Sequence, residues 1–276
     1  MKILQIHNFY QQGGGEDKVF NDEYEALKRR GHDVHQITFS NDMIKTDFHK
    51  VKTAINLILN KNDLEHLAKK ITEIKPSVIH LHNNFPIINN SVFEISSKLK
   101  IPVVQTLHNF RYICIGSTLF RENNICENCV GNSGINGVLH KCYKNSFFGS
   151  LTASFFQNNF KRQNFLEKGL LNFICLNDFA KQKFVQAGLP KESLFVKPNF
   201  INNNDFLNED LILPTNERKN IIYVGRLSIE KGVLDLVEIA KSNPSIKFEI
   251  IGDGPLFERI KSHAPNNLEL LGLQTK

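Results

Sequence analysis

The 276-residue sequence lacks any long uninterrupted apolar segment. No window approaches the roughly 18 consecutive apolar residues of a membrane span. Met1-Lys2 leads directly into a strand-length apolar stretch, without the long apolar region and small-residue cleavage site of a signal peptide. These absences predict a cytoplasmic protein, one that can also work at the inner face of a membrane.

Charge of one sign is not massed anywhere in the chain. The 34 Lys and Arg residues are dispersed among 28 Asp and Glu, which leaves a net charge of +6. This excess suits phosphorylated ligands or an anionic membrane surface, but it is too diffuse to indicate nucleic-acid binding. A content of 41% hydrophobic and 22% charged residues is typical of globular proteins and excludes a disordered chain.

Two catalytic signatures are also missing. The turn Gly13-Gly14-Gly15 follows the first predicted strand, but Glu16-Asp17-Lys18 comes next, so it does not have the G-x-G-x-x-G spacing of a dinucleotide oxidoreductase. Paired carboxylates at glycosidase spacing are not evident either, which argues against sugar hydrolysis.

Short apolar runs do alternate with amphipathic helical patterns throughout the chain, as in a parallel sheet covered by helices. The predicted strands are 3–7, 34–39, 77–81, 103–107, 173–176, 194–197, 220–224, 247–251 and 268–271. The predicted helices are 16–30, 53–74, 91–99, 178–188, 231–242 and 255–262, with Asp178 as the N-cap of its helix.

The pattern divides into an N-terminal Rossmann-like domain over 1–200, a linker over 201–219, and the start of a second Rossmann-like domain over 220–276. The linker is predicted from its Asn-rich composition and its lack of periodicity. Three strands and two helices make only half of a doubly wound domain. The fold class is therefore α/β with two Rossmann-like domains, the second incomplete.

Two segments at strand ends are candidates for phosphate binding. The Gly13–Gly15 turn opens a helix whose amides can receive phosphate, although a plain tight turn explains it equally well. Arg226 and Lys231 follow a strand of the second domain and can neutralise a diphosphate. The alternative is two solvated basic residues on a loop.

His80 and His82 alternate on one strand and therefore share a face, next to Asn83 at the carboxyl end. This group can bind acceptor hydroxyls, or it can be a strand end packed under a loop.

An insertion near 111–145 contains four of the five cysteines, Cys114, Cys126, Cys129 and Cys142. The Cys126-x2-Cys129 pair, flanked at similar distances by the other two, can enclose a tetrahedral structural zinc. Free thiols or disulfides remain open, although a cytosolic location disfavours disulfides. Cys175 lies in a predicted strand and is assigned to the core.

The stretch from Phe147 to Phe165 interleaves phenylalanines with Lys161 and Arg162. A basic aromatic helix of this kind can make a peripheral membrane contact, where a lipid-linked acceptor would be presented. The alternative, which such stripes more often represent, is a helix packed in the core.

Taken together, motifs along the whole chain resemble family 4 glycosyltransferases. They are Gly13-Gly14-Gly15-Glu16-Asp17, Gly31-His32-Asp33-Val34, His80-Leu81-His82-Asn83, Thr106-Leu107-His108-Asn109, Lys197-Pro198-Asn199, Gly225-Arg226-Leu227 with Lys231-Gly232, and Ile251-Gly252-Asp253-Gly254-Pro255. The resemblance implies a GT-B fold and retaining transfer of a sugar from a nucleoside-diphosphate donor to a saccharide or lipid-linked acceptor, in cell-surface polysaccharide synthesis. It implies no catalytic metal.

The resemblance also implies residue roles. Gly13, Gly14 and Gly15 approach the donor phosphates, while Arg226 and Lys231 hold the departing diphosphate. His108 bonds the transferred sugar or the transition state, His82 and Asn83 lie on the acceptor side, and Gly252 and Gly254 form the nucleotide wall. We expect His108 and the glycine turn to face the same cleft as Arg226 and Lys231.

One element of similar enzymes, a Glu-x7-Glu segment in the second domain, cannot be placed in these 276 residues. We therefore expect the first domain to fold, Leu268–Leu271 to form an exposed apolar edge, and the chain to have little or no transferase activity. The alternative to an active transferase is a truncated remnant that binds ligand without transferring sugar.

Overall fold

The computed structural model describes residues 1–11, 13–59, 65–162, 169–201, 214 and 217–274. Its contacts divide the chain into two compact units: Met1–Arg121 with Ile125–Asn203, and Glu122–Asn124 with Asn204–Lys276. The predicted linker, 201–219, falls largely outside the described residues, so its limits stay a prediction.

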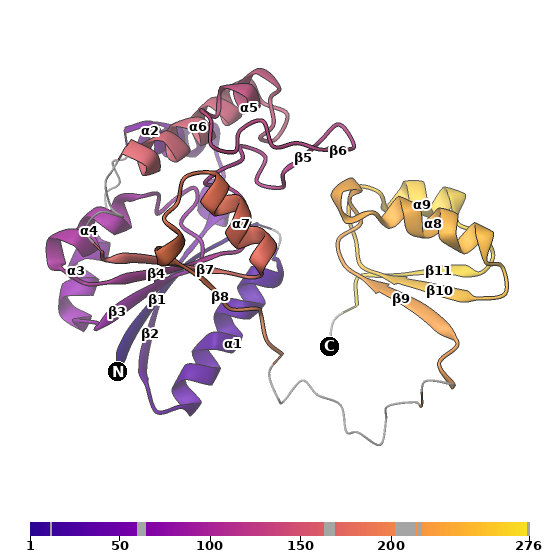
Figure 1. The fold of residues 1–276 in the computed structure, drawn as a ribbon, viewed down its shortest axis with the longest axis horizontal. Coiled ribbons are helices and arrows are strands. Elements are labelled where there is room, and N and C mark those ends of the chain that lie inside the picture. Colours follow the sequence, from indigo (N-terminus) through magenta and orange to yellow (C-terminus); the bar gives the residue numbers. More distant parts are fainter. Residues whose placement is uncertain (12, 60–64, 163–168, 202–213, 215–216, 275–276) are drawn as a thin grey trace. The chain divides into compact units, whose positions relative to one another are not determined.

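The first unit is built on a sheet of six parallel strands in the order β2-β1-β3-β4-β7-β8 (Figure 1). The strands are β1 (Lys2–Phe9), β2 (Asp33–Ser40), β3 (Val78–Leu81), β4 (Val103–Leu107), β7 (Leu171–Cys175) and β8 (Leu194–Val196). The central β1 is buried along six consecutive residues because helices cover both faces of a parallel sheet. All six strands were predicted from their apolar runs.

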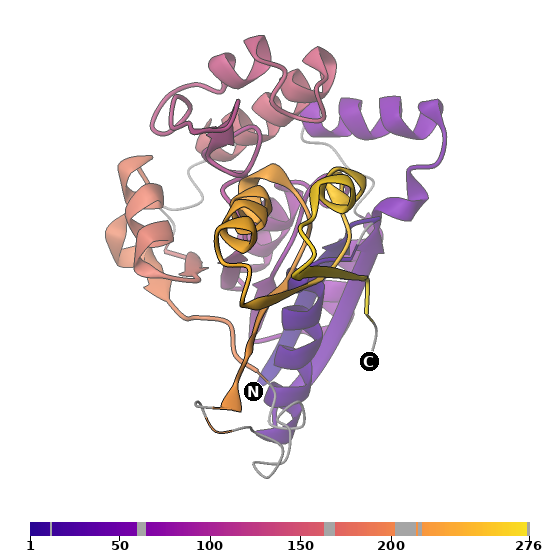
Figure 2. The same cartoon turned by 90° about the vertical axis from the view of Figure 1, so that its right-hand side faces the viewer.

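Seven helices of the described residues belong to this unit: α1 (Gly15–Arg29), α2 (Asp47–Leu59), α3 (Glu65–Ile74), α4 (Ser91–Leu99), α5 (Ile135–Leu139), α6 (Phe147–Arg162) and α7 (Asp178–Gln186). Both views place α2, α5 and α6 together above the sheet (Figures 1 and 2). A two-stranded hairpin, β5 (Phe120–Arg121) and β6 (Asn124–Ile125), projects from the same insertion.

Two details differ from the sequence prediction. The single helix expected over 53–74 is two helices, α2 and α3, with 60–64 outside the described residues. The N-cap of α7 is Asn177 and not Asp178, because the Asn177 side chain accepts from the Ala180 amide at 2.8 Å. Helix α5 and the β5–β6 hairpin carry no strong apolar period and were not predicted.

The strand order places a topological switch point between β1 and β3. The chain leaves β1 toward β2 on one side, whereas β3, β4, β7 and β8 lie on the other. Backbone hydrogen bonds join the two strand ends there: His82 donates to Ile6 O at 3.0 Å and Asn8 donates to Asn83 O at 3.0 Å. Ligands of open α/β sheets bind at the carboxyl ends of the strands beside such a point.

The second unit has a parallel sheet in the order β11-β10-β9, with β9 (Asn220–Val224), β10 (Lys247–Ile251) and β11 (Leu268–Gly272). Helices α8 (Val233–Ser242) and α9 (Phe257–His263) pack on one face of it (Figure 1). A single turn of 3-10 helix, Ile229–Lys231, precedes α8.

The expectation of an exposed apolar edge at Leu268–Leu271 is wrong in its location. Leu268 is 7% exposed, and Leu270 packs against the core of α8 and α9. The exposed apolar strand is β9, where Ile222 is 56% and Val224 is 72% exposed. Side chains of β11 reach the helices, whereas those of β9 largely do not.

Candidate functional site

Imidazole rings gather at the carboxyl end of the first sheet. His7 comes from β1, His80 and His82 from β3 and its end, and His108 from the residue after β4. The rings of His80 and His82 lie 4.3 Å apart, and those of His82 and His108 stack at 5.3 Å. His7, His80 and His82 are buried, whereas His108 is half-buried, so this group reaches solvent through His108.

The carboxylate of Glu23, on helix α1, joins these rings. Its Oε2 lies 3.3 Å from Nδ1 of His80 and 3.4 Å from Nε2 of His82. Its Oε1 accepts from Nζ of Lys197, just beyond β8, at 2.6 Å. Glu23 is 5% exposed, so a buried carboxylate here connects α1, β3 and the end of β8.

The charge states of these groups follow from burial and from their partners. Burial acts to raise the pKa of Glu23, but the nearby rings of His82 and His80 and the Lys197 ammonium lower it to about 2. Burial lowers the pKa of His82 to about 3 and that of His108 to about 4, against the opposing effect of Glu23. Burial also lowers the pKa of His80. At neutral pH, Glu23 is therefore charged and the rings are neutral.

These charge states decide which ring nitrogens carry hydrogen. Nε2 of His82 lies 3.4 Å from the Glu23 carboxylate, without the geometry of a hydrogen bond. The negative charge still favours hydrogen on Nε2, which makes Nδ1 of His82 an acceptor. Nε2 of His108 lies 3.1 Å from that Nδ1 and must donate to it. Nδ1 of His108 is therefore unprotonated. In His80 the hydrogen is on Nδ1, because Nδ1 faces the Glu23 carboxylate and Nε2 faces the Thr106 hydroxyl.

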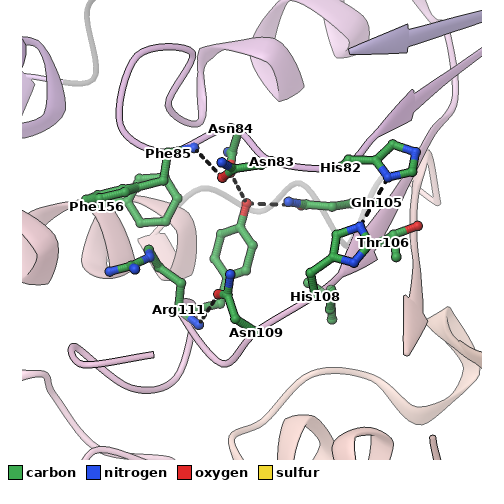
Figure 3. A pocket seen from close by; sticks show the side chains of 12 residues that line it. His82, Asn83, Asn84, Phe85, Gln105, Thr106, His108, Asn109, Arg111 and Phe156 are labelled. Atoms are coloured by element: carbon green, nitrogen blue, oxygen red, sulfur yellow. Dashed lines mark hydrogen bonds between the residues drawn. The ribbon is translucent and has the colours of Figure 1, made fainter. Parts of the chain in front are cut away.

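A pocket opens beside this group (Figure 3). His82 and His108 form one side of it, and Arg111 and Phe156 lie on the other. The other polar residues of the lining are Asn83, Asn84, Gln105, Thr106, Asn109 and Tyr112. No residue of the lining carries a carboxylate.

Much of this polar lining is already hydrogen-bonded within the protein. The Asn83 amide donates to Asn8 O at 2.7 Å, and its Oδ1 accepts from the Phe85 amide at 3.0 Å. The Tyr112 hydroxyl contacts Asn84 Oδ1 at 3.1 Å and Gln105 Oε1 at 3.0 Å. These contacts fix the pocket wall, and the acceptor-side role of His82 and Asn83 stays a prediction.

The glycine turn lies at the start of α1. The Gly14 amide donates to Asp17 Oδ2 at 2.9 Å, so one of the three turn amides already has an acidic partner. A Cβ on Gly14 or Gly15 would meet nothing within 4 Å, and neither residue has a positive φ. The local fold therefore does not require glycine at these two positions.

The second unit holds the other predicted donor residues. Arg226 follows β9 and Lys231 ends the 3-10 turn before α8, and both are exposed. Gly252 has a φ of +143°, and a Cβ there would lie 1.9 Å from Gly225 O. A Cβ on Gly254 would lie 2.5 Å from Leu227 O. These two glycines let the β9–α8 and β10–α9 loops approach at backbone contact.

The predicted site residues are thus divided between the units. His82, Asn83, His108 and the glycine turn belong to the first unit, whereas Arg226, Lys231, Gly252 and Gly254 belong to the second. The expectation that both sets face one cleft stays a prediction.

Glu23, His80 and His82 also have the composition of a metal site. They are the one group, among the described residues, whose three ligand atoms lie within 4.8 Å of one another. Lys197, however, already places an ammonium 2.6 Å from the Glu23 carboxylate, where it would repel a divalent cation. The residues present therefore favour a hydrogen-bonded ion pair.

The four predicted metal cysteines, Cys114, Cys126, Cys129 and Cys142, line a second pocket, formed within the insertion. None of them is in a disulfide. Cys175 is buried in β7, as expected for a core residue.

Glu23 and Lys197 were not predicted as site residues. Glu23 follows Val19 and Phe20 at helical spacing and lies with them on the buried face of α1. An acid on an apolar helix face is the signal that marks it, since buried carboxylates require partners.

Comparison with known proteins adds the family. The model for Glycosyltransferase Family 4 matches residues 13–205, and that for Glycosyl transferases group 1 matches residues 208–270. No curated protein matches the chain significantly. Among the described residues, no helix combines the length and the apolarity needed to cross a membrane.

Two solved structures share the fold. Anabaena HepE, in complex with UDP-glucose, superposes with a TM-score of 0.58 at 14% identity, over 100% of this chain and 70% of that one. The apo lipopolysaccharide outer core galactosyltransferase WaaB gives 0.52 at 12% identity, over 100% and 69%. The GT-B fold is confirmed, with a small second domain. With more than half of its length matched by the family model, the chain belongs to glycosyltransferase family 4.

Proposed function

We propose that this chain transfers a sugar, with retention of anomeric configuration, from a nucleoside-diphosphate donor to a saccharide or lipid-linked acceptor in cell-surface polysaccharide synthesis. Family membership supports the transfer reaction. The similar HepE structure contains UDP-glucose, which supports a uridine nucleotide sugar as the first donor to test.

The observation that carries the proposal is the chain of contacts Glu23–His82–His108. The charge of the Glu23 carboxylate, 3.4 Å from Nε2 of His82, favours hydrogen on that nitrogen, and the contact between His82 Nδ1 and His108 Nε2 then orients His108. A neutral His108 with its Nδ1 lone pair free of a proton can accept a hydrogen bond from a sugar hydroxyl. A group held in one tautomer before the substrate arrives needs no reorganisation during the reaction.

The same groups favour retention over inversion. An inverting transferase needs a base that removes the proton of the attacking hydroxyl. The pocket lining has no carboxylate, and pKa values of about 3 for His82 and about 4 for His108 make these imidazoles weak bases at neutral pH. Leaving-group stabilisation must therefore supply much of the rate acceleration.

We assign that stabilisation to Arg226 and Lys231, with no catalytic metal. Both are exposed cations beyond a strand end, which is where open α/β sheets bind phosphates. Gly14 and Gly15 support a close approach of donor phosphates to the first unit, because the fold itself leaves space for a side chain there. Gly252 and Gly254 are assigned to the wall beside the nucleotide.

Peripheral membrane contact is proposed for the start of α6. Phe148 is 77% and Phe147 is 44% exposed, and Lys141 and Lys144 precede them. Phe156 and Phe160, further along the helix, are buried. The core interpretation therefore holds for this later part of the aromatic stretch, and only its start is available to a membrane that presents a lipid-linked acceptor.

Isothermal titration of the 276-residue chain with UDP-sugars tests the donor assignment. Arg226→Ala is expected to weaken binding at least about tenfold, since it removes a charge-assisted contact with the diphosphate. Lys241→Ala removes an exposed cation of the same unit, paired with Glu238, and should leave binding unchanged. Equal affinities for wild type and Arg226→Ala would refute the diphosphate role.

Turnover separates the proposal from its alternative. If Arg226 acts on charge that develops as the diphosphate leaves, Arg226→Ala should lower kcat by roughly 10²-fold. Tight donor binding without transfer by the wild-type chain would instead favour a ligand-binding remnant.

A further inference from the structure

The insertion between β4 and α6 brings four cysteines to one place. Cys114 lies in the first turn of the insertion, Cys126 and Cys129 follow the β5–β6 hairpin, and Cys142 follows α5. All four line one pocket, although they come from three separate segments. Sequence spacing alone does not require this convergence.

Backbone hydrogen bonds hold each of these segments. Cys114 donates from its amide to Phe110 O at 2.8 Å, Cys126 to Leu119 O at 2.9 Å, and Cys142 to Gly137 O at 2.9 Å. The Cβ positions from which the sulfurs project are therefore fixed by the loop fold.

The four thiols are enclosed to different degrees. Cys129 is buried, with 8% of its surface exposed, whereas Cys114, Cys126 and Cys142 are half-buried. Four thiols that line one pocket and form no disulfide can each supply a thiolate, and structural zinc takes four such ligands.

We propose that Cys114, Cys126, Cys129 and Cys142 bind one structural zinc ion. Zinc prefers four thiolates in a tetrahedron, and at a Zn–S distance of about 2.3 Å the sulfurs lie roughly 3.8 Å apart. No three of these sulfurs lie within 4.8 Å of one another in the described structure. The proposal therefore requires the sulfurs to move inward on zinc binding, by rotation of the cysteine side chains.

The zinc would stabilise one wall of the candidate active site. Arg111, in the same insertion, donates to Ser117 Oγ at 3.1 Å, and its guanidinium lies 4.5 Å from the Phe85 ring. The ring of Tyr143, next to Cys142, lies 5.1 Å from the same guanidinium. A metal that fixes Cys114 and Cys142 thus also holds in place Ser117 and Tyr143, which contact Arg111 and lie close to these two cysteines in the chain.

Metal content of the full chain, purified without chelator, tests the proposal. Elemental analysis should find one zinc per chain, and Cys126→Ser/Cys129→Ser should lose it. Cys175→Ala changes the one cysteine outside the pocket and should keep the zinc. Because the double variant can fail to fold, the wild-type protein is also tested by thiol modification, which should release the zinc as the four thiols react.

Cobalt substitution tests the geometry. Cobalt in the wild-type protein should give the intense visible ligand-field and sulfur charge-transfer bands of tetrahedral thiolate coordination. The proposal is overturned by four free thiols without zinc, by a disulfide among the four cysteines, or by iron in place of zinc. Zinc retained by the cysteine variant but lost by His82→Ala would place the metal at Glu23, His80 and His82 instead.

Discussion

At the scale of single residues, Glu23 determines the state of the site because it contacts two imidazoles and an ammonium at once. A glutamine at this position keeps the shape but lacks the negative charge that faces both rings and Lys197. The contacts predict that Nε2 carries the hydrogen in His82 and His108, whereas Nδ1 carries it in His80.

Glu23→Gln should therefore change the tautomers of the site histidines without unfolding the protein. Nitrogen NMR of the histidine rings should show the predicted pattern in wild type and a mixture in Glu23→Gln, with kcat lowered on the order of 10²-fold. Glu25→Gln, on the exposed face of the same helix, should leave both unchanged. A purely structural role for Glu23 would lower stability without altering the tautomers of the folded fraction.

At the scale of elements, the two loops of the second unit depend on glycine. Gly252→Ala places a Cβ against Gly225 O with φ at +143°, and we expect a loss of roughly 3 kcal/mol in the free energy of unfolding. Gly272 also has a positive φ, +69°, but a Cβ there meets nothing within 4 Å. Gly272→Ala should therefore cost only about 1 kcal/mol.

Urea unfolding of both variants measures the difference. If the two losses were equal, backbone strain alone would explain the glycines and the close approach of the loops would be irrelevant.

The elements also show how far sequence reasoning reaches. Strands such as β4 and β10 were predicted with their observed limits, because short stretches rich in apolar residues are bounded by turn residues, Pro102 before β4 and Gly252 after β10. His82 and His108 were predicted at neighbouring strand ends for the same reason. Glu23 was missed, because a helical apolar period does not reveal which polar residue faces a partner on a distant strand. The short α5 and the hairpin depend on tertiary contacts, which no local pattern records.

At the scale of the whole molecule, the buried neutral histidines predict acid sensitivity. His82 and His108 have native pKa values of about 3 and about 4, below the ordinary value of 6.5. At a pH between the native pKa of each histidine and 6.5, the unfolded chain binds a proton that the folded chain does not. The free energy of unfolding therefore falls as the pH drops below about 6.5. Each histidine contributes a slope of about 1.4 kcal/mol per pH unit. The low pKa of Glu23, about 2, extends the loss below about pH 4.5.

Chemical denaturation at a series of pH values should show this slope. His108→Gln should make it shallower, whereas His66→Gln, which removes an exposed histidine of α3, should not change it. A stability that stays constant down to about pH 5 would mean that these histidines are charged in the folded protein.

The central claim, retaining transfer from a nucleotide sugar, is tested most directly by the anomeric configuration of the first product. Proton NMR early in the reaction with an α-linked UDP-sugar reports the anomeric configuration of the new glycosidic bond. Early spectra also show the configuration of any sugar released by hydrolysis before its anomers equilibrate. Our account predicts an α-configured product from the wild-type chain and a much slower reaction from Arg226→Ala. A β-configured product would contradict it.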